Sequence, residues 1–250
     1  MSLDQRIEYL EMKNRHKKRL RPWYKKTWGI IAIILGIIIL SAAIAASIYI
    51  SKQVKLYQQQ NNAINETQET AKITAAIDGR GESFGLGPND AKVQIVIFSD
   101  FACSYCQQAA PILRNLSKKY GDQVHFVFRN YPLHENSISL ALAANCAGEQ
   151  DKFWDMHDLL FDRQKQLNNF DDNTVKAPLK EIAAEMKLDT AKFDTCLDKQ
   201  TYLYRLNDDF ADAELLGLSG TPTWFINRYK VTGYYPEENF ISVIDGLLAQ

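Results

Sequence analysis

The chain has 250 residues, of which 46% are hydrophobic and 24% are charged, a composition that allows one sizeable folded core and an appendage. Twelve Gly, seven Pro and four Cys exclude a collagen-like chain and a disulfide-dense miniprotein, and a net charge of -1 argues against a nucleic-acid binder that acts through bulk charge. The charge is uneven. Residues 1–27 hold nine Lys or Arg against three Asp or Glu, residues 51–83 hold four of each, and residues 84–250 hold sixteen against twenty-three.

An apolar stretch without a charged residue runs from Trp28 to Ile50. As a helix it would be roughly 34 Å long, enough to cross a hydrocarbon core of about 30 Å, and a lone span must be helical to satisfy its backbone. The short flank before it contains a basic cluster, whereas the flank after it has only Lys52 and Lys55 nearby; the cluster is Lys17, Lys18, Arg19, Arg21, Lys25 and Lys26. This bias predicts a single-pass cell-membrane protein with residues 1–27 as a cytoplasmic tail, residues 28–50 as the transmembrane anchor and the rest outside the cytoplasm.

Two alternatives concern this N-terminal part. The basic tail could bind nucleic acid or calmodulin, although beside a span a topology signal is the better interpretation. Small residues at 41–47 resemble a signal-peptidase site, although apolar residues continue to Ile50, which favours an uncleaved signal-anchor. In both cases the remainder of the chain is exported into an oxidising, extracytoplasmic compartment such as the periplasm.

Residues 51–83 are polar and are expected to form a stalk or linker. Seven positions in it follow the alternating spacing of a coiled-coil seam, but four of them are amides or Ala; they are Val54, Tyr57, Asn61, Ile64, Gln68, Ala71 and Ala75. This composition favours a solvated helical or flexible stalk, with dimerisation as the alternative. Gly-containing segments at 78–81 and 85–88 end any helix and place the folded domain at residues 84–250.

A short apolar run from Val93 to Phe98 predicts a buried strand, and Cys103-Ser104-Tyr105-Cys106 follows it directly. The next segment has helical apolar spacing up to Gly121, although Pro111 within it could be a helix breaker. Cys103 would lie at the helix N-terminus, where unpaired N–H groups and the helix dipole stabilise a thiolate. Cys106, one turn along, should be more buried and protonated. Such a pair is suited to disulfide exchange and predicts an oxidant of other proteins.

Two other interpretations of the cysteines are a zinc half-site and an inert disulfide. Zinc would need two more ligands in a suitable spacing, and Cys146 and Cys196 form no second CxxC motif, so we expect no metal. In an exported protein these two cysteines most economically form a structural disulfide, and two buried free thiols are the alternative. No cofactor motif is present.

Further elements are predicted by periodicity. Strands are expected at 123–129, 224–227 and 230–233. Helices are expected at 138–150 with Ser137 as the N-cap, at 152–163, at 174–188, across 190–216 with Asp189 as the cap, and at 236–249.

Three motifs carry a resemblance to a known family: GPNDAKVQIVIFSDFACSYC, PLHENSISLALAANCAGEQDKFWDMHDLLF and GLSGTPTWFIN. In this order, from about Phe84 to Gln250, they resemble the exported bacterial DsbA-type (DsbA/BdbD-like) thiol–disulfide oxidoreductases of the thioredoxin superfamily. The resemblance implies an α/β thioredoxin fold with an inserted helical domain at about 134–217. Pro111 resembles the helix-kinking proline of thioredoxin folds, so we expect the helix after Cys103 to run through it. It also implies that Cys103 attacks, that Cys106 resolves, and that Thr221 and a cis Pro222 form the substrate-binding loop facing them. Reduced exported proteins would be the substrates, and a membrane quinone-linked thiol oxidase would restore the disulfide.

The chain departs from this family at two positions that bear on activity. Ser104 and Tyr105 separate the cysteines, whereas strong oxidants of the family have a His beside the second Cys; Tyr105 cannot supply that positive charge. Ile97 stands where many relatives carry a buried acid, and spacing does not show whether Asp100 faces Cys106. These differences leave room for isomerase or reductase action, favoured if the stalk dimerises. A redox-inactive peptide-binding module is the other alternative. The four histidines have no recognisable ligand spacing with carboxylates and are expected to be structural or on the surface: His16, His125, His134 and His157.

Overall fold

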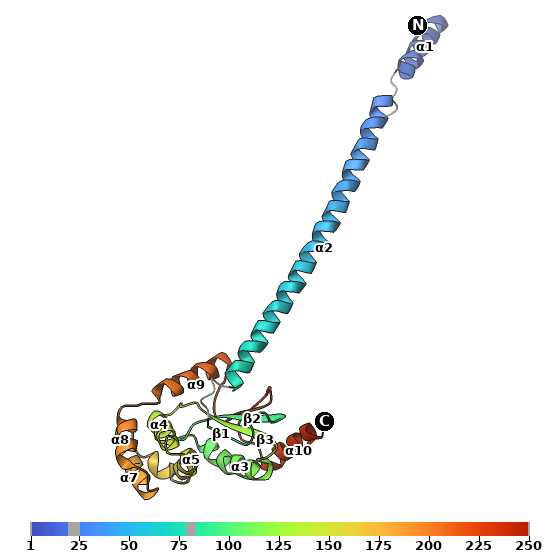
Figure 1. Cartoon of the computed structure of the whole chain (residues 1–250). Helices are drawn as coiled ribbons and strands as arrows, with labels where there is room; N and C mark the ends of the chain where they lie inside the picture. The colour runs from blue at the N-terminus through green and yellow to red at the C-terminus, as the bar shows by residue number, and fades with distance from the viewer. Residues whose placement is uncertain (1, 20–25, 79–83, 250) are drawn as a thin grey trace. The chain divides into compact units, whose positions relative to one another are not determined.

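The computed structural model describes residues 2–19, 26–78 and 84–249, and Figure 1 shows the elements in chain order. The chain divides into two compact units, Met1–Thr67 and Gln68–Gln250. The basic residues Arg21 and Lys25 and the expected helix breakers at 79–81 lie outside the described residues.

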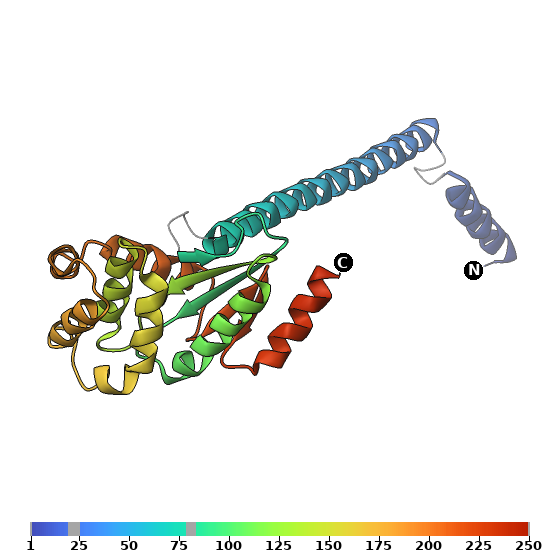
Figure 2. The same cartoon turned by 60° about the horizontal axis from the view of Figure 1, so that its bottom comes forward.

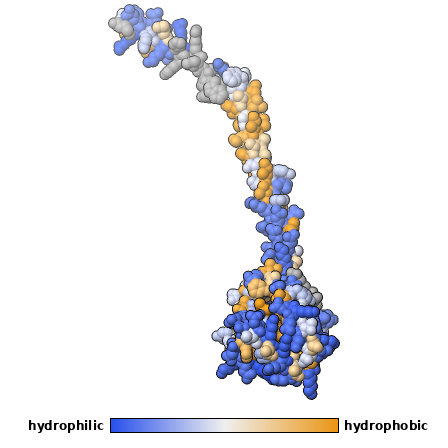
Figure 3. Space-filling view, turned by 90° about the vertical axis from the view of Figure 1, so that its left-hand side faces the viewer, coloured by the Kyte–Doolittle hydropathy of each residue, from blue (hydrophilic) through white to orange (hydrophobic). Residues whose placement is uncertain are grey.

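The first unit contains helix α1 (Leu3–Arg19) and most of helix α2 (Thr27–Asp78). Within the described part of the chain, α2 is the one helix that is long and apolar enough to cross a membrane, with a mean hydropathy of 2.8 over its most apolar window. Figure 3 shows its apolar side chains as an orange band. The helix continues without a break from Ile50 to Asp78, so the expected stalk is helical up to that residue. Its side chains Val54, Tyr57 and Ile64 are exposed.

The second unit is built on a five-stranded sheet with the order β1-β3-β2-β4-β5. The strands are β1 (Phe84–Leu86), β2 (Val93–Ser99), β3 (Val124–Asn130), β4 (Thr223–Ile226) and β5 (Tyr229–Thr232). Strands β2 and β3 pair in parallel and the other pairs are antiparallel. The expected α/β class is therefore confirmed. Strand β1 was not predicted, because three residues around Gly85 are too few to show an alternating pattern.

Helices flank the sheet and fill the connection between β3 and β4. Helix α3 (Ser104–Tyr120) follows β2 and runs through Pro111, as expected. Six helices form the insertion: α4 (Ser137–Gly148), α5 (Phe153–Asp162), α6 (Gln164–Leu167), α7 (Lys176–Glu185), α8 (Thr190–Asp198) and α9 (Leu203–Leu215). Helix α10 (Glu237–Leu248) closes the fold. Where one helical region was expected across 190–216, the structure has two helices, because the chain turns at Gln200, which has φ of 50°.

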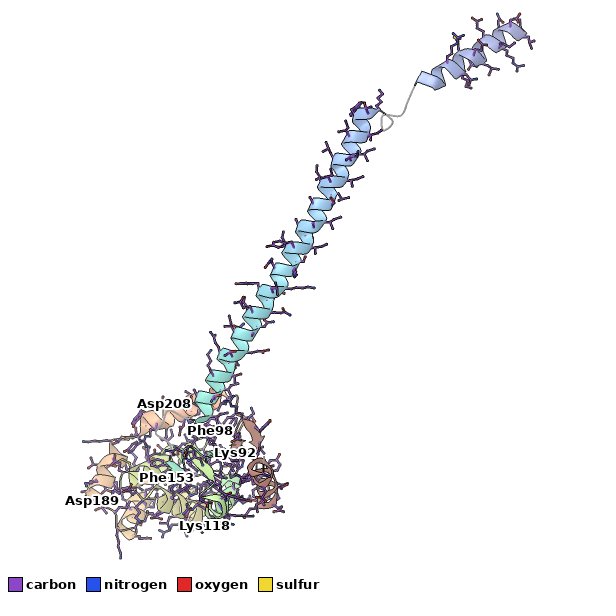
Figure 4. All side chains as sticks on the ribbon, turned by 45° about the vertical axis from the view of Figure 1, so that its right-hand side comes forward. Lys92, Phe98, Lys118, Phe153, Asp189 and Asp208 are labelled. Atoms are coloured by element: carbon purple, nitrogen blue, oxygen red, sulfur yellow. A yellow bond between two sulfur atoms is a disulfide. The ribbon has the colours of Figure 1, made fainter. Side chains whose placement is uncertain are left out.

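The sheet has a separate hydrophobic core on each face. On one face, Ile95, Phe126, Phe128 and Trp224 pack in a cluster with residues of α3, α10 and the inserted helices. Figure 2 shows α3 and α10 next to each other on this face, and Figure 4 labels Phe153 of α5 inside the unit and Lys118 and Asp189 at its surface. The insertion therefore packs beside α3, the helix that contains Cys106 and has Cys103 as its N-cap.

On the opposite face, Val96, Phe98 and Phe225 pack against Ile77, in the last turn of α2, and against residues of α9. A fully buried cation, Arg129 of β3, crosses this core beside the Phe98 ring. Its guanidinium pairs with Asp209 and with Asp212, at 2.7 Å, and donates to the carbonyl of Ala76 at 2.9 Å. The end of α2 is thus part of the folded unit.

Candidate functional site

The CxxC motif lies where strand β2 ends and helix α3 begins. Cys103 is the N-cap residue of α3, with extended backbone angles (φ -79°, ψ 124°), and its N–H donates to the carbonyl of Asp100 at 3.1 Å. Cys103 retains 7% of its accessible surface and Cys106 none, and both are free thiols. Ser104 and Tyr105 lie in the exposed first turn, with Tyr105 58% exposed.

The two thiols have opposite electrostatic environments. The Cys106 thiol donates a hydrogen bond to the Cys103 sulfur and is the main cause of a Cys103 pKa of about 5, against an ordinary value of 9.0. The Thr221 hydroxyl and the N–H groups of Cys106 and Tyr105 add to this, whereas burial opposes it. Burial, followed by its bond to Cys103, raises the pKa of Cys106 far above the usual range. Near neutral pH the site therefore holds one thiolate and one buried thiol.

Two hydrogen-bond donors partly offset the burial of Cys106. The Asp100 N–H lies 3.4 Å from the Cys106 sulfur, and the hydroxyl of the buried Ser99 also contacts it; both interactions lower the pKa of Cys106. Ser99 is the last residue of β2 and Asp100 follows it directly, so the end of the strand and the residue after it supply contacts to the Cys106 thiol.

The loop before β4 faces Cys103. The Thr221–Pro222 peptide bond is cis, the isomer that the resemblance implied, and the Thr221 carbonyl lies 3.4 Å from the Cys103 sulfur. The Pro222 carbonyl accepts a hydrogen bond from Gly233 N–H at 2.7 Å, which ties the loop to the end of β5. The structure therefore brings Cys103, Cys106, Thr221 and Pro222 together.

The other two cysteines lie outside this cluster. Cys146 of α4 and Cys196 of α8 form a disulfide within the insertion, with a Cα–Cα distance of 5.8 Å. Both residues are buried.

A buried carboxylate beside the motif forms a network that sequence analysis did not find. Asp100 is 1% exposed, and its two oxygens accept hydrogen bonds from Ala102 N–H (2.8 Å), the Ser137 hydroxyl (2.5 Å) and Leu133 N–H (2.7 Å). The half-exposed ring of His134 pairs with it through Nδ1 at 2.7 Å. Ser137 thus bonds to Asp100 instead of capping α4, whose N-cap is Asn136. Because Leu133, His134 and Ser137 lie more than thirty residues from Asp100, no local spacing indicates these contacts.

Amide side chains of the insertion also reach the motif. Gln164 donates to the carbonyls of Phe101 and Cys103, and Asn168 donates to the carbonyl of Ala102. These contacts were missed for the same reason, since they join residues more than sixty positions apart.

Among the residues that the structure describes, no group of three or more His, Cys, Asp or Glu side chains could hold a metal ion. The chemistry that the arrangement offers is that of its sulfurs. A thiolate that retains a small exposed surface, beside a fully buried thiol, can form a mixed disulfide with another protein and then release it.

Comparisons with known sequences place the second unit in a family. The sequence model of the family described as Thioredoxin matches residues 79–246. Two curated relatives are named Na(+)/H(+) antiporters: NhaA 1 of Salinispora arenicola is 34% identical over 166 residues (65% of this chain, 24% of that protein), and NhaA 3 of Salinispora tropica is 38% identical over 152 residues (60% and 22%). The chain therefore spans about a quarter of the length of these relatives.

Solved structures show the same fold. A variant of alpha-DsbA1 from Wolbachia pipientis matches with a TM-score of 0.63 at 21% identity, covering 70% of this chain and 95% of that one. Oxidised BdbD from Bacillus subtilis matches with a TM-score of 0.59 at 25% identity, covering 66% and 92%. The chain therefore belongs to the thioredoxin family and has the fold of the DsbA- and BdbD-type thiol–disulfide oxidoreductases.

Proposed function

We propose that the chain introduces disulfides into exported proteins by dithiol–disulfide exchange through Cys103 and Cys106. The observation that carries this proposal is the asymmetry of the pair, a Cys103 thiolate with a pKa of about 5 beside a buried Cys106 thiol. Stabilising the thiolate stabilises the reduced form of the pair and so makes the disulfide form a stronger oxidant.

The reaction starts from the oxidised protein. A substrate thiolate attacks the Cys103 sulfur, the Cys103–Cys106 bond breaks, and Cys106 leaves and takes up a proton. A second substrate thiolate then attacks the substrate sulfur of this mixed disulfide, and Cys103 leaves as a thiolate. Two electrons pass from the substrate dithiol to the protein, the substrate gains one disulfide, and Cys103 and Cys106 end in the reduced state of this structure.

The Thr221–Pro222 loop is proposed to bind the substrate, and its position supports this role. The Thr221 backbone faces the Cys103 sulfur, where it can pair with an extended substrate segment as an added strand would. Reduced exported proteins are the proposed substrates, and Ser104 and Tyr105, exposed in the first turn of α3, would modulate the exchange.

The proposed location is the cell membrane, with residues 28–50 as the anchor, residues 1–27 in the cytoplasm and the catalytic domain outside it. The apolar part of α2 and the basic residues before it support this topology. Re-oxidation requires a two-electron acceptor, for which the family resemblance suggests a membrane quinone-linked thiol oxidase.

The test is oxidation of a reduced dithiol peptide by the oxidised full-length protein. We expect stoichiometric oxidation by the wild type and none by Cys103→Ser or Cys106→Ala, since neither variant can form the Cys103–Cys106 disulfide. Mixed with a peptide that already carries a disulfide, reduced Cys106→Ala should accumulate a mixed disulfide through Cys103, because the resolving thiol is missing. The Cys146→Ala/Cys196→Ala double variant is the matched control and should oxidise the peptide. Full activity of Cys103→Ser would refute the proposal.

The reduction potential of the pair separates the alternatives. A potential close to those of cytosolic thioredoxins would favour a reductase, and shuffling of a scrambled substrate by a dimer would favour an isomerase. If Cys103 showed no enhanced reactivity at neutral pH, a redox-inactive peptide-binding module would be the better description.

A further inference from the structure

Three successive carbonyls of the active-site loop are held by the insertion. The Gln164 amide donates to the carbonyls of Phe101, at 2.7 Å, and Cys103, at 2.9 Å. The Asn168 amide donates to the carbonyl between them, that of Ala102, at 3.0 Å. Both donors come from the short helix α6 and its C-cap.

Most of this contact is buried. Gln164 is 3% exposed, and Phe101, Ala102 and Cys103 are 1%, 6% and 7% exposed. A buried carbonyl without a hydrogen-bond donor is destabilised, because it has lost its water and gained no partner. Conformations of the loop that break these bonds are therefore unfavourable. The three bonds therefore fix the loop against the insertion.

The carbonyl of Cys103 connects this contact to the thiolate. Besides Gln164, it accepts the N–H of Gln107 at 3.1 Å, the hydrogen bond with which α3 begins. The N–H groups of Tyr105 and Cys106, which stabilise the Cys103 thiolate, belong to the same first turn. Since each peptide unit is planar, the bond to the Cys103 carbonyl also orients the N–H of Ser104, the first residue of α3, and so fixes the direction in which the first turn leaves Cys103. Holding the carbonyl side of the loop thus holds the donor side toward the sulfur.

We propose that Gln164 and Asn168 are positioning residues for Cys103, through which the inserted helices set the stability of the thiolate and the redox equilibrium of the pair. The inference rests on the proposed function, because it concerns the same two sulfurs. It adds a role for the insertion: α6 tunes the centre without touching a reacting atom.

The experiment compares full-length wild type with Gln164→Met, Asn168→Ala and Asn169→Ala. Gln164→Met keeps the length and burial of the side chain and removes its donors. Asn169→Ala is the matched control, since Asn169 is exposed on the same segment and its amide bonds only within that segment, to the carbonyl of Lys165. Each protein is equilibrated with reduced and oxidised glutathione, the pH dependence of Cys103 alkylation is recorded, and thermal unfolding is followed in both redox states.

For Gln164→Met we expect the equilibrium to move about three- to tenfold toward the disulfide form, which is about 15–30 mV for a two-electron couple. The reason is that a less well-oriented first turn destabilises the thiolate, and with it the reduced protein. The alkylation midpoint should rise, and the melting temperature of the reduced form should fall more than that of the oxidised form. Asn168→Ala should shift the equilibrium less and in the same direction, and Asn169→Ala should match the wild type.

The inference would be overturned if Gln164→Met and Asn168→Ala both showed the glutathione equilibrium and the alkylation midpoint of the wild type. The amides would then have a structural role only, whatever the melting temperatures. If Gln164→Met does not fold, the exposed position of Asn168 lets Asn168→Ala decide. Failure of the wild type to oxidise a dithiol peptide would instead count against the proposed function, since the comparison of variants with wild type needs no protein substrate.

Discussion

Cys103 is the N-cap of α3 and Cys106 lies in its first turn, yet burial affects the two thiols unequally. Cys103 gains more from its donors than it loses by burial, whereas for Cys106 burial dominates. The exposed Tyr105 adds no charge to the thiolate. The Cys103 thiolate is therefore stabilised by hydrogen bonds from the first turn, from Cys106 and from Thr221, and not by an adjacent cation.

This environment predicts the pH dependence of Cys103 reactivity. In the reduced protein, the rate of alkylation by iodoacetamide should rise through a midpoint near pH 5, well below the ordinary thiol value of 9.0. Because the folded pKa is lowered, the stability that the thiolate contributes is complete above the unfolded value and is lost as the pH falls through 5. In Cys106→Ala the midpoint should move upward, since its main donor is gone. A wild-type midpoint above 8 would contradict this account.

A second titration is predicted at His157. Its ring is fully buried among Phe101, Phe128, Trp154 and Phe161, and burial lowers its pKa, with Asp158 opposing the shift. Since the folded pKa is lowered, this ring makes the domain less stable as the pH falls below about 6.5, with a slope of at most about 1.4 kcal/mol per pH unit. Urea unfolding between pH 7 and pH 5 should show a smaller loss for His157→Phe than for wild type. Identical losses would exclude His157 as a source of acid sensitivity.

At the scale of elements, the insertion is joined to the catalytic loop by polar contacts and closed internally by the Cys146–Cys196 bridge between α4 and α8. His134 and Ser137, at the start of the insertion, contact Asp100, and the α6 amides, later in the insertion, contact the carbonyls of the CxxC loop. The insertion is thus fixed to the CxxC loop from two directions.

Removal of the Cys146–Cys196 bridge should lower stability without abolishing chemistry. The bridge closes a loop of 50 residues, for which the chain-entropy model gives about 4 kcal/mol. We expect Cys146→Ala/Cys196→Ala to lose about that much free energy of unfolding in urea and to retain oxidation of a dithiol peptide. Loss of redox activity with an unchanged unfolding curve would show instead that the bridge acts in exchange.

Local pattern was enough to predict some elements and not others. The continuous apolar run Val93–Phe98 indicated β2, and the helical spacing after Cys106 indicated α3, because each signal lies within one element. Asp189 was correctly predicted as the cap of α8, since a cap bonds three residues away. Two contacts, that of Asp100 with His134 and that of Gln164 with the Cys103 carbonyl, could not be predicted, because only the tertiary fold brings these residues together. The cis state of Pro222 was expected only from the family resemblance.

At the scale of the whole molecule, a charge-poor apolar helix and a thioredoxin-family domain occur in one chain. The basic residues lie on the N-terminal side of the apolar stretch. Positive charge before a span keeps that side in the cytoplasm, so the cysteines would be held outside it, where disulfides persist.

This topology can be checked by proteolysis. The protein should remain with the membrane fraction after alkaline extraction, and protease added outside intact spheroplasts should remove the domain while residues 1–27 stay protected. A tag at each terminus reports the two ends. Protection of the C-terminal tag, or release of the protein by alkali, would contradict the anchored arrangement.

The buried end of α2 bears on how a soluble fragment should be cut for crystallography or NMR. Ala76 and Ile77 are 2% and 1% exposed, and Arg129 depends on the Ala76 carbonyl for one of its acceptors. A truncation that starts at residue 84 would uncover the apolar patch around Phe98 and Phe225 and invite aggregation. A truncation that starts at residue 68 keeps the last turns of α2, which belong to the folded second unit.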